Sequence, residues 1–155
     1  MSDADKRTPA IDSRRALRLA RLKHANAVLI EISKVGNNTW ANEAGAVCRL
    51  QLTTDGRVHF RDHNPTTPTI DLHTTARGVH GFWPGFPYKG SEALLLRGLR
   101  DYVTSGTKIH RTLLVPKVNG RLARGYTDAD VAAIEYRLRF SPIFVEPWPA
   151  PAPQC

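Results

Sequence analysis

Apolar residues at intervals of three and four mark the first predicted helix. They are Leu19, Leu22, Ala25, Val28, Leu29 and Ile32. This spacing places side chains on one face of a helix, where they can pack against a core. Asp12 or Ser13 can cap the N-terminus, and a Gly-Asn-Asn run at residues 36–38 is a typical stop. We therefore expect an amphipathic helix over residues 13–35, after a flexible N-terminal arm over residues 1–12.

Two alternating runs on either side of a Thr-Asp-Gly sequence at residues 54–56 predict a β-hairpin. A two-residue turn would pair Leu52 with His59 and so mix core and solvent positions on one face. A three-residue loop, with Gly56 in the left-handed conformation, gives one apolar face instead. The apolar pairs in this register are Leu52 with Val58 and Leu50 with Phe60.

The opposite face of this hairpin is polar and basic. Its pairs are Thr53 with Arg57, Gln51 with His59, and Arg49 with Arg61. Cations gathered on a sheet face can contact phosphate groups, whereas separate solvated cations only favour solubility. This face is therefore a predicted binding surface.

Two further strands are predicted after the hairpin. Residues 69–75 alternate, with inner positions at Ile70 and Leu72 and outer positions at Asp71 and His73. Residues 108–116 form a second apolar run, which Pro116 ends. The sheet is thus expected to contain the hairpin plus one or two strands.

Two more helices complete the predicted elements. The first covers residues 92–105, between the cap Ser91 and the stop Gly106, and the second covers residues 128–140, capped by Thr127. The buried face of the first consists of Leu95, Leu99, Tyr102 and Val103. We expect an α+β fold, a small mainly antiparallel sheet packed by three helices. The single domain covers residues 13–145, and a Pro-rich tail follows over residues 146–155.

Composition narrows the class of partner. The chain has 155 residues, with 22 Lys and Arg against 14 Asp and Glu, a net charge of +8. Such a balance favours nucleic acid or an acidic protein surface as partner. No secretory signal or membrane-spanning run is apparent, and the two cysteines, Cys48 and Cys155, make a poor disulfide framework. We therefore expect a cytoplasmic protein that does not bind membranes.

The predicted nucleic-acid contacts are basic residues that recur in separate segments. They are Arg14, Arg15, Arg18 and Arg21 on the first helix, Arg49, Arg57, His59 and Arg61 on the hairpin, and Lys89 before the second helix. Contacts to phosphate carry little sequence information, so binding of DNA or RNA with low specificity is expected. A solvated basic face that serves only solubility is the alternative interpretation.

An aromatic loop, GFWPGFPYKGS, covers residues 81–91. Phe82 and Phe86 are expected to pack under the second helix, which leaves Trp83 and Tyr88 as a possible partner-binding pair. Exposed aromatic residues are typical of protein interfaces. This loop and the Pro-rich tail support an alternative function, a protein-interaction factor that modulates a host or phage complex.

Metal or catalytic chemistry has less support. His59 and His63 are four residues apart, but exposed strand histidines are more often surface residues, so no metal site is expected. The run Asp62-His63-Asn64-Pro65 is similar to the Asp-His and Pro core of HNH nucleases, although a strand rather than a helix is predicted to follow it. Cys48 is expected to be inert packing. We therefore predict no catalytic residue and no cofactor, and place a metal-dependent nuclease third among the functions.

Three short motifs carry a resemblance. They are His24-Ala25-Asn26, the Gly85-Phe86 loop that runs to Gly90, and Asp101-Tyr102-Val103 before Gly106. Over about residues 14–144 the chain resembles a group of short, largely uncharacterised proteins carried by proteobacterial phages, prophages and plasmids. Pro87-Tyr88-Lys89-Gly90 stands where that group has Ser-His-Gly-Gly, and Asp62-His63-Asn64-Pro65 replaces an acid-rich stretch. The resemblance implies a mobile genetic element as the setting and implies no activity. The leading expectation is a small, basic, non-enzymatic accessory protein that binds nucleic acid.

Overall fold

The computed structural model describes residues 9–34, 40–41, 45–74, 83, 90–114, 117–118, 121–122 and 126–145. The helices are α1 (Pro9–Ser33), α2 (Gly90–Ser105) and α3 (Asp128–Leu138), with a 3₁₀ turn, η2 (Arg111–Leu113). The strands are β1 (Arg49–Leu52), β2 (Val58–Arg61), β3 (Ile70–Asp71), β4 (Lys117–Val118) and β5 (Arg121–Leu122). Residues 1–8 of the predicted arm and the Pro-rich tail lie outside the described residues.

The main sheet has the order β1-β2-β3, and both pairs of neighbouring strands are antiparallel. The hairpin register is the predicted one, with Leu50 opposite Phe60 and Leu52 opposite Val58. Gly56 has a φ of +85°, the left-handed conformation expected of the three-residue loop. The predicted third strand is confirmed but shorter, because β3 pairs with β2 over two residues only.

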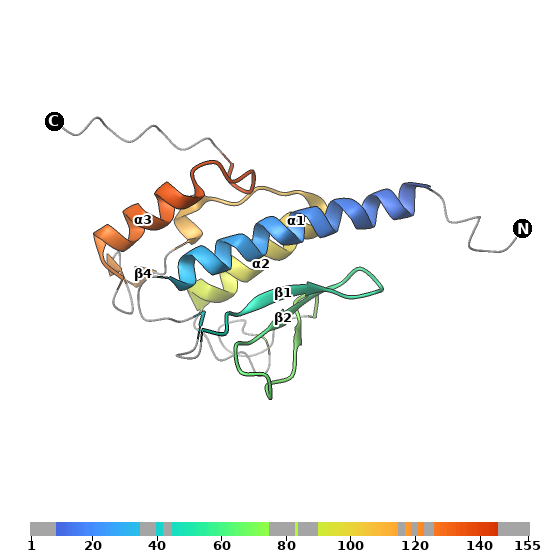
Figure 1. Ribbon diagram of the computed structural model, residues 1–155, viewed down its shortest axis with the longest axis horizontal. Helices are drawn as coiled ribbons and strands as arrows, with labels where there is room; N and C mark the ends of the chain where they lie inside the picture. Colours follow the sequence, from blue (N-terminus) through green and yellow to red (C-terminus); the bar gives the residue numbers. More distant parts are fainter. Residues whose placement is uncertain are drawn as a thin grey trace, which may run out of the picture.

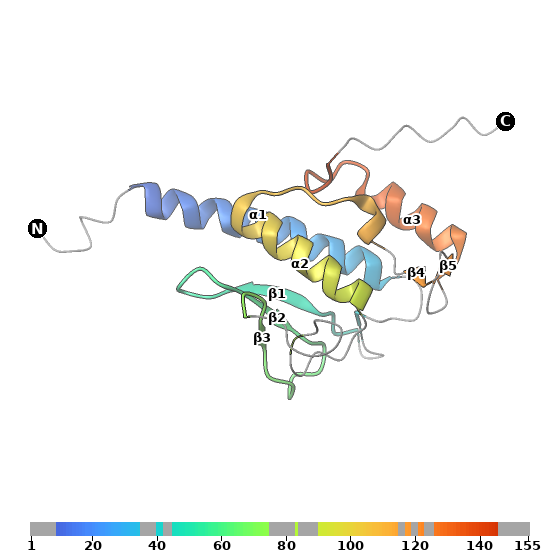
Figure 2. The ribbon, with the colours of Figure 1, turned by 180° about the vertical axis from the view of Figure 1, so that it is seen from behind.

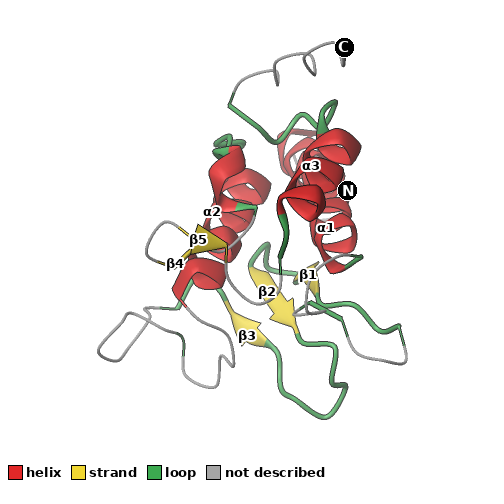
Figure 3. Cartoon of the chain, turned by 90° about the vertical axis from the view of Figure 1, so that its left-hand side faces the viewer, coloured by secondary structure: helices red, strands yellow, loops and turns green. Residues whose placement is uncertain are grey.

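The helices form a layer over one face of this sheet (Figures 1 and 3). Helix α1 lies beside α2 and contacts β1, while α3 packs against α1. The apolar face of the hairpin turns toward the helices, as amphipathic layers require. The large side chains that are fully buried include Leu29, Ile32, Trp40, Leu50, Phe60, Leu99 and Ile134. The α+β class, three helices against a small antiparallel sheet, is therefore confirmed.

Helix α1 begins at Pro9, four residues before the predicted start at residue 13. Proline is favoured in the first turn of a helix, where its missing N–H has no intrahelical acceptor. Ala25, Val28, Leu29 and Ile32 are fully buried as predicted, but Leu19 is 44% exposed. The N-terminal end of α1 extends beyond α2 and the hairpin (Figures 1 and 2). Leu19 lies further along the helix, so the predicted apolar stripe was too wide at this position.

Helices α2 and α3 follow the sequence closely. The predicted buried face of α2 is confirmed, and Gly106 ends the helix with a φ of +75°. Thr127 caps α3 in a capping box, accepting a hydrogen bond from the backbone N–H of Asp130 while the Asp130 carboxylate accepts one from Thr127. The cap satisfies backbone donors that a helix N-terminus otherwise leaves unpaired.

The strand predicted over residues 108–116 is wrong. Among residues 108–114, the described part of this run, only Ile109 makes a strand-like contact, an isolated parallel bridge with Phe144, and residues 111–113 form η2 instead. The apolar run is explained by burial rather than by sheet pairing, because Ile109 and Leu114 are 4% and 2% exposed. Strands β4 and β5 pair with each other in a separate antiparallel ladder.

Candidate nucleic-acid interface

Helix α1 is attached to the edge of β1 by the side chain of Asn26. The Asn26 amide donates from Nδ2 to the Leu50 carbonyl at 3.0 Å, and its Oδ1 accepts from the Leu50 N–H at 2.7 Å. The backbone N–H of Thr53 donates to the Arg57 carbonyl, so the backbone N–H and C=O of Thr53 face β2. Because these groups alternate in direction along a strand, the N–H and C=O of Leu50 point away from β2. Asn26 therefore occupies the outer edge of the hairpin and fixes α1 against it.

Two arginines of α1 hold the hairpin tip, residues 53–57. Arg15 donates from Nη1 to the Thr53 carbonyl at 2.9 Å, and Arg18 donates from Nη1 to the Gly56 carbonyl at 3.0 Å. The approach is close, because a Cβ on Gly56 would lie 2.8 Å from Arg18 Nη1. Glycine at this position therefore permits the left-handed backbone and also leaves room for the Arg18 side chain of α1.

These contacts enclose a pocket of about 250 Å³, which we call the arginine pocket. It is lined by Arg14, Arg15, Arg18, Leu52, Thr54, Asp55 and Gly56. Three guanidinium groups therefore meet one carboxylate there, which leaves an excess of positive charge. The Thr53 hydroxyl donates a hydrogen bond to Asp55 and lowers the pKa of that carboxyl, so Asp55 is ionised at neutral pH.

The arginines of the pocket keep donors available for a ligand. Each guanidinium carries five N–H donors, of which Arg15 and Arg18 use one apiece on the hairpin carbonyls. Arg18 Nε is inaccessible to solvent and has no hydrogen-bond partner among the described residues. Arg14 is exposed at the rim of the pocket. An anion bound in the pocket would satisfy such donors.

Arg21, predicted with these residues, lies elsewhere. A Cβ on Gly106 would be 2.7 Å from Arg21 Nη2, so the guanidinium stands against the C-terminal end of α2. A cation is favoured at that position because of the partial negative charge of the helix end. Burial raises the pKa of the nearby Tyr102 phenol, and the charge of Arg21 opposes that rise. Arg21 does not line the arginine pocket.

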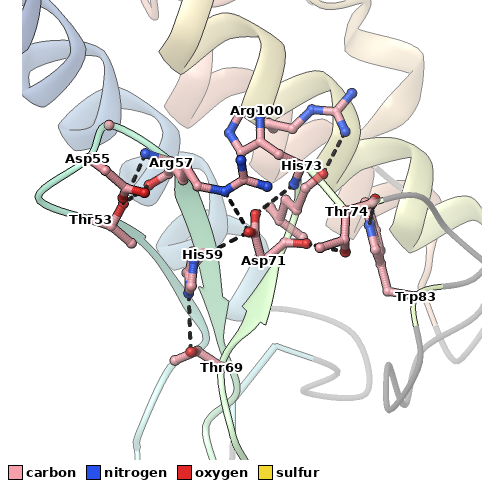
Figure 4. Close-up of polar contacts among 12 residues, drawn as sticks. Thr53, Asp55, Arg57, His59, Thr69, Asp71, His73, Thr74, Trp83 and Arg100 are labelled. Carbon is pink, nitrogen blue, oxygen red and sulfur yellow. Dashed lines mark hydrogen bonds and ion pairs between the residues drawn. The ribbon is translucent and has the colours of Figure 1, made fainter.

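The outer face of the hairpin forms a partly neutralised network around Asp71 (Figure 4). Arg57 Nε donates to Asp71 Oδ2 at 2.6 Å, and His59 Nε2 lies 3.8 Å from the same oxygen. His59 Nδ1 is 3.2 Å from the Thr69 hydroxyl. Burial raises the pKa of Asp71, but the hydrogen bonds from Arg57 and from the backbone of His73 outweigh it and lower the pKa. Arg57 is therefore paired, which reduces the charge that this face offers to phosphate.

His73 stands beside this network. Burial, together with the positive charges of Arg100 and Arg57, lowers the pKa of the His73 imidazole. Arg100 Nη1 donates to the Leu72 carbonyl at 2.7 Å, which holds α2 against the strand that leads to His73 (Figure 4). His73 is consequently neutral at neutral pH.

The remaining predicted contacts are not brought to the pocket. Arg49 and Arg61 face each other at the far end of the hairpin, and Arg61 Nη1 donates to the Thr67 carbonyl at 3.0 Å. Arg49 is exposed, and its side chain makes no hydrogen bond or ion pair with other described residues. Lys89 lies outside the described residues. The predicted basic surface is therefore divided, and its concentrated part consists of Arg14, Arg15 and Arg18.

The proposed role of Trp83 as an exposed partner-binding residue is wrong. Trp83 is 2% exposed, its indole Nε1 donates to the Thr74 carbonyl at 3.2 Å, and Arg97 lies 5.1 Å from its ring centroid. Burial of this ring is favourable because the indole is mostly apolar and its single donor has an acceptor. Tyr88 lies outside the described residues, as do Phe82 and Phe86.

Exposed aromatic side chains occur instead at the end of α3, where the sequence interpretation did not place them. Tyr136 is 59% exposed and Phe140 is 86% exposed. The Arg139 guanidinium carbon lies 3.7 Å from the Tyr136 ring centroid and 4.6 Å from that of Phe140. Their four-residue spacing near the helix terminus was the available signal.

Residues that could hold a metal ion gather at the far end of the hairpin from its tip. Cys48, Asp62 and His63 each offer one ligand atom, and these atoms lie within 4.8 Å of one another. The sequence interpretation considered His59 with His63, whereas the structure turns His59 to the outer face, toward Thr69. Cys48 was the overlooked member of the group.

No protein-family model matches this chain, and comparisons with curated proteins and with solved structures give no match. Within the described residues, no helix combines the length and the apolar character needed to cross a membrane.

Proposed function

We propose that this protein binds nucleic acid without catalysing a reaction, as a small basic accessory protein of a mobile genetic element. The observation that supports the proposal is the arginine pocket, in which Arg14, Arg15 and Arg18 meet the hairpin tip. Arginine is well suited to such a role, because its planar fork of donors matches phosphate oxygens in a bidentate geometry.

The hydrogen bonds to the hairpin tip strengthen this proposal. Because Arg15 and Arg18 are already fixed on the Thr53 and Gly56 carbonyls, they lose less side-chain entropy when a phosphate binds. Asp55 sets a limit on the pocket, since its carboxylate would repel a phosphate placed next to it. A phosphate is therefore expected on the Arg14 side, away from Asp55.

The proposed partner is DNA or RNA read through its backbone. The guanidinium groups of the pocket suit phosphate oxygens, which carry no sequence information, so low sequence specificity is expected. An acidic protein surface would present carboxylates to the same guanidinium groups and is the competing partner for this site.

The test is a fluorescence-anisotropy titration of labelled single- and double-stranded DNA and RNA at several salt concentrations. Neutralising three phosphates of duplex DNA gives a slope of log affinity against log salt of about −2.7. Arg14→Gln should weaken binding to all sequences alike and reduce that slope by about one. Arg111→Gln is the matched control, because Arg111 is exposed on η2 and has no partner among the described residues.

Two results would contradict the proposal. One is the absence of binding by the wild-type protein at low salt. The other is an equal loss of affinity for Arg14→Gln and Arg111→Gln, which would indicate attraction by net charge alone.

A protein-interaction factor that modulates a host or phage complex is the second candidate, and it rests on a different surface from the one the sequence indicated. The exposed rings of Tyr136 and Phe140 favour it, because aromatic residues with a neighbouring arginine are enriched at protein interfaces. A pull-down after nuclease treatment that depends on Phe140 would support this function over nucleic-acid binding.

A metal-dependent, HNH-like nuclease remains the third candidate. After His63 the chain forms turns and β3 through residue 74, without the helix that such a nuclease uses for a further ligand. An assay of metal-dependent cleavage with wild type and His63→Ala tests it, and the absence of cleavage by wild type removes it.

A further inference from the structure

At the end of the hairpin opposite the arginine pocket, polar residues lie on the inner, otherwise apolar face. Cys48 directly precedes β1 and Asp62 directly follows β2, one step beyond the Arg49–Arg61 pair. Continued antiparallel register therefore puts Cys48 and Asp62 opposite each other. Alternation also puts both on the inner face, in line with Leu50. A thiol and a carboxylate thus stand at the end of an otherwise apolar row.

Burial makes this position costly for a carboxylate. Cys48 is 1% exposed, and the Asp62 side chain is 10% exposed. A carboxylate withdrawn from water must be compensated by hydrogen bonds or by a cation. Asp62 Oδ1 accepts from the backbone N–H of His63 at 2.9 Å, and the Cys48 thiol donates to it at 3.5 Å. Two chemically different donors therefore converge on one oxygen.

His63 adds an imidazole to the same point. Its Nε2 lies 3.7 Å from Asp62 Oδ1, while its Nδ1 is inaccessible to solvent and has no hydrogen-bond partner among the described residues. Buried ring nitrogens normally have a partner. Nε2 is therefore the ring nitrogen directed toward Asp62, and Nδ1 makes no hydrogen bond with the described residues that would fix the ring in another orientation.

The separations match those within a tetrahedral metal site. With zinc bonds of about 2.3 Å to sulfur and about 2.0 Å to oxygen or nitrogen, neighbouring ligand atoms stand about 3.3–3.5 Å apart. The Cys48 Sγ–Asp62 Oδ1 distance of 3.5 Å and the His63 Nε2–Asp62 Oδ1 distance of 3.7 Å are close to this. The third separation, between Cys48 Sγ and the His63 ligand nitrogen, is within 4.8 Å, so a bound ion would draw these two groups together around it.

We propose that Cys48, Asp62 and His63 bind a zinc ion, or another borderline-soft divalent transition metal, at the end of the hairpin. The thiolate and imidazole select such a metal over Mg²⁺ and Ca²⁺, which prefer sets of oxygen ligands. On binding, the Cys48 thiol loses its proton to solvent and the thiolate coordinates, so affinity rises with pH. The ion joins the start of β1 to the end of β2. This inference does not depend on nucleic-acid binding.

The test is a titration with Co²⁺ of the Cys155→Ser protein, in which Cys48 is the one remaining cysteine. One equivalent of Co²⁺ should produce a thiolate-to-cobalt charge-transfer absorption, which Zn²⁺ displaces and excess Mg²⁺ does not. Cys48→Ser should abolish the absorption, and His63→Ala should weaken Co²⁺ binding at least about tenfold. His59→Ala is the matched control, because this histidine of β2 faces Thr69 instead.

The proposal is overturned if the folded protein gives no charge-transfer absorption, if the absorption survives Cys48→Ser, or if His59→Ala and His63→Ala weaken binding equally. A second measurement needs no substitution at the proposed ligands. Zn²⁺ should raise the Tm of the Cys155→Ser protein in a saturable manner that a chelator reverses, because a ligand that binds the folded state stabilises it. An unchanged Tm at saturating Zn²⁺ would also overturn it.

Discussion

The two ends of the β1–β2 hairpin use the same pair of strands for opposite purposes. At the tip, Arg15 and Arg18 of α1 bind backbone carbonyls, and the charged groups gather around a pocket. At the far end, Cys48 and Asp62 turn inward, and their polar atoms face each other. The tip gathers cationic groups, while the far end gathers groups that can donate an electron pair.

Both ends depend on the same central residue pair of the hairpin, which lies between them. Leu50 and Phe60 pair there, with Asn26 holding the outer edge and the core holding the inner face. A one-residue slip in register would turn Cys48 outward and Arg49 inward, which would exchange the faces at both ends. Both proposed sites therefore require the same strand register. Variants can show whether each site is lost when the centre of the hairpin is disturbed.

The largest expected effect is the loss of the shared centre. Phe60→Ala removes a ring that is 1% exposed and should reduce the free energy of unfolding by about 3–5 kcal/mol. Both ends should fail together, with weaker nucleic-acid binding and weaker Co²⁺ binding. Urea denaturation measures the stability. His59→Ala, the neighbour on the outer face, is the control, and equal losses for the two variants would contradict this account of the hairpin.

The next effect concerns the edge that α1 covers. Asn26→Ala leaves the N–H and C=O of Leu50 without these partners and should cost about 1–3 kcal/mol of unfolding free energy. Chemical denaturation checks the value, and His24→Ala, exposed on the same helix, should change it little. A similar cost for both would mean that the amide contact contributes nothing specific.

A smaller change separates the tip from the far end. Gly56→Ala places a Cβ on a residue with a φ of +85°, at 2.8 Å from Arg18 Nη1, and should cost about 1–2 kcal/mol. It should also weaken nucleic-acid binding while leaving Co²⁺ affinity unchanged. Gly45→Ala is the matched control, since Gly45 has a φ of +87° but no atom within 4 Å of the added Cβ. Equal effects on nucleic-acid affinity would remove Arg18 from the site.

The smallest effect is pH-dependent and lies on the outer face. Asp71 has a lowered pKa, so its interaction with Arg57 stabilises the fold above about pH 4, the ordinary range of an unfolded carboxyl. That stability, on the order of 0.5–1 kcal/mol, is lost as pH falls through the lowered pKa. Asp71→Asn should therefore be less stable than wild type at pH 7, and the difference should narrow below pH 4. A stability difference that stays constant with pH would contradict the role given to the Asp71 carboxylate. In an Arg57→Gln background, the stability difference that Asp71→Asn causes should disappear.

Local rules were sufficient for much of the fold. The alternation of apolar residues and the left-handed tendency of Gly56 predicted the hairpin register, and Thr127 predicted the start of α3. Each of these depends on residues within a few positions of one another. Extending the predicted register by one residue would also have placed Cys48 opposite Asp62.

Contacts between distant segments were beyond the sequence. Ile109 pairs with Phe144 rather than with a neighbouring strand, and no local pattern distinguishes that bridge from a β-strand. Trp83 was expected on the surface because it belongs to a run rich in glycine and proline that is typical of a loop, while its burial is accompanied by a hydrogen bond to the distant Thr74 carbonyl. The division of the basic residues likewise depends on how far α1 extends along the hairpin.

The contact between Asn26 and Leu50 also bears on association between copies of the chain. Strand β1 lies at an edge of the sheet, and an edge with free N–H and C=O groups is a template on which a second molecule can add a strand. In this protein one amide side chain occupies that template. Its loss would expose edge N–H and C=O groups as well as weaken the fold, so aggregation of Asn26 variants is expected in addition to their lower stability.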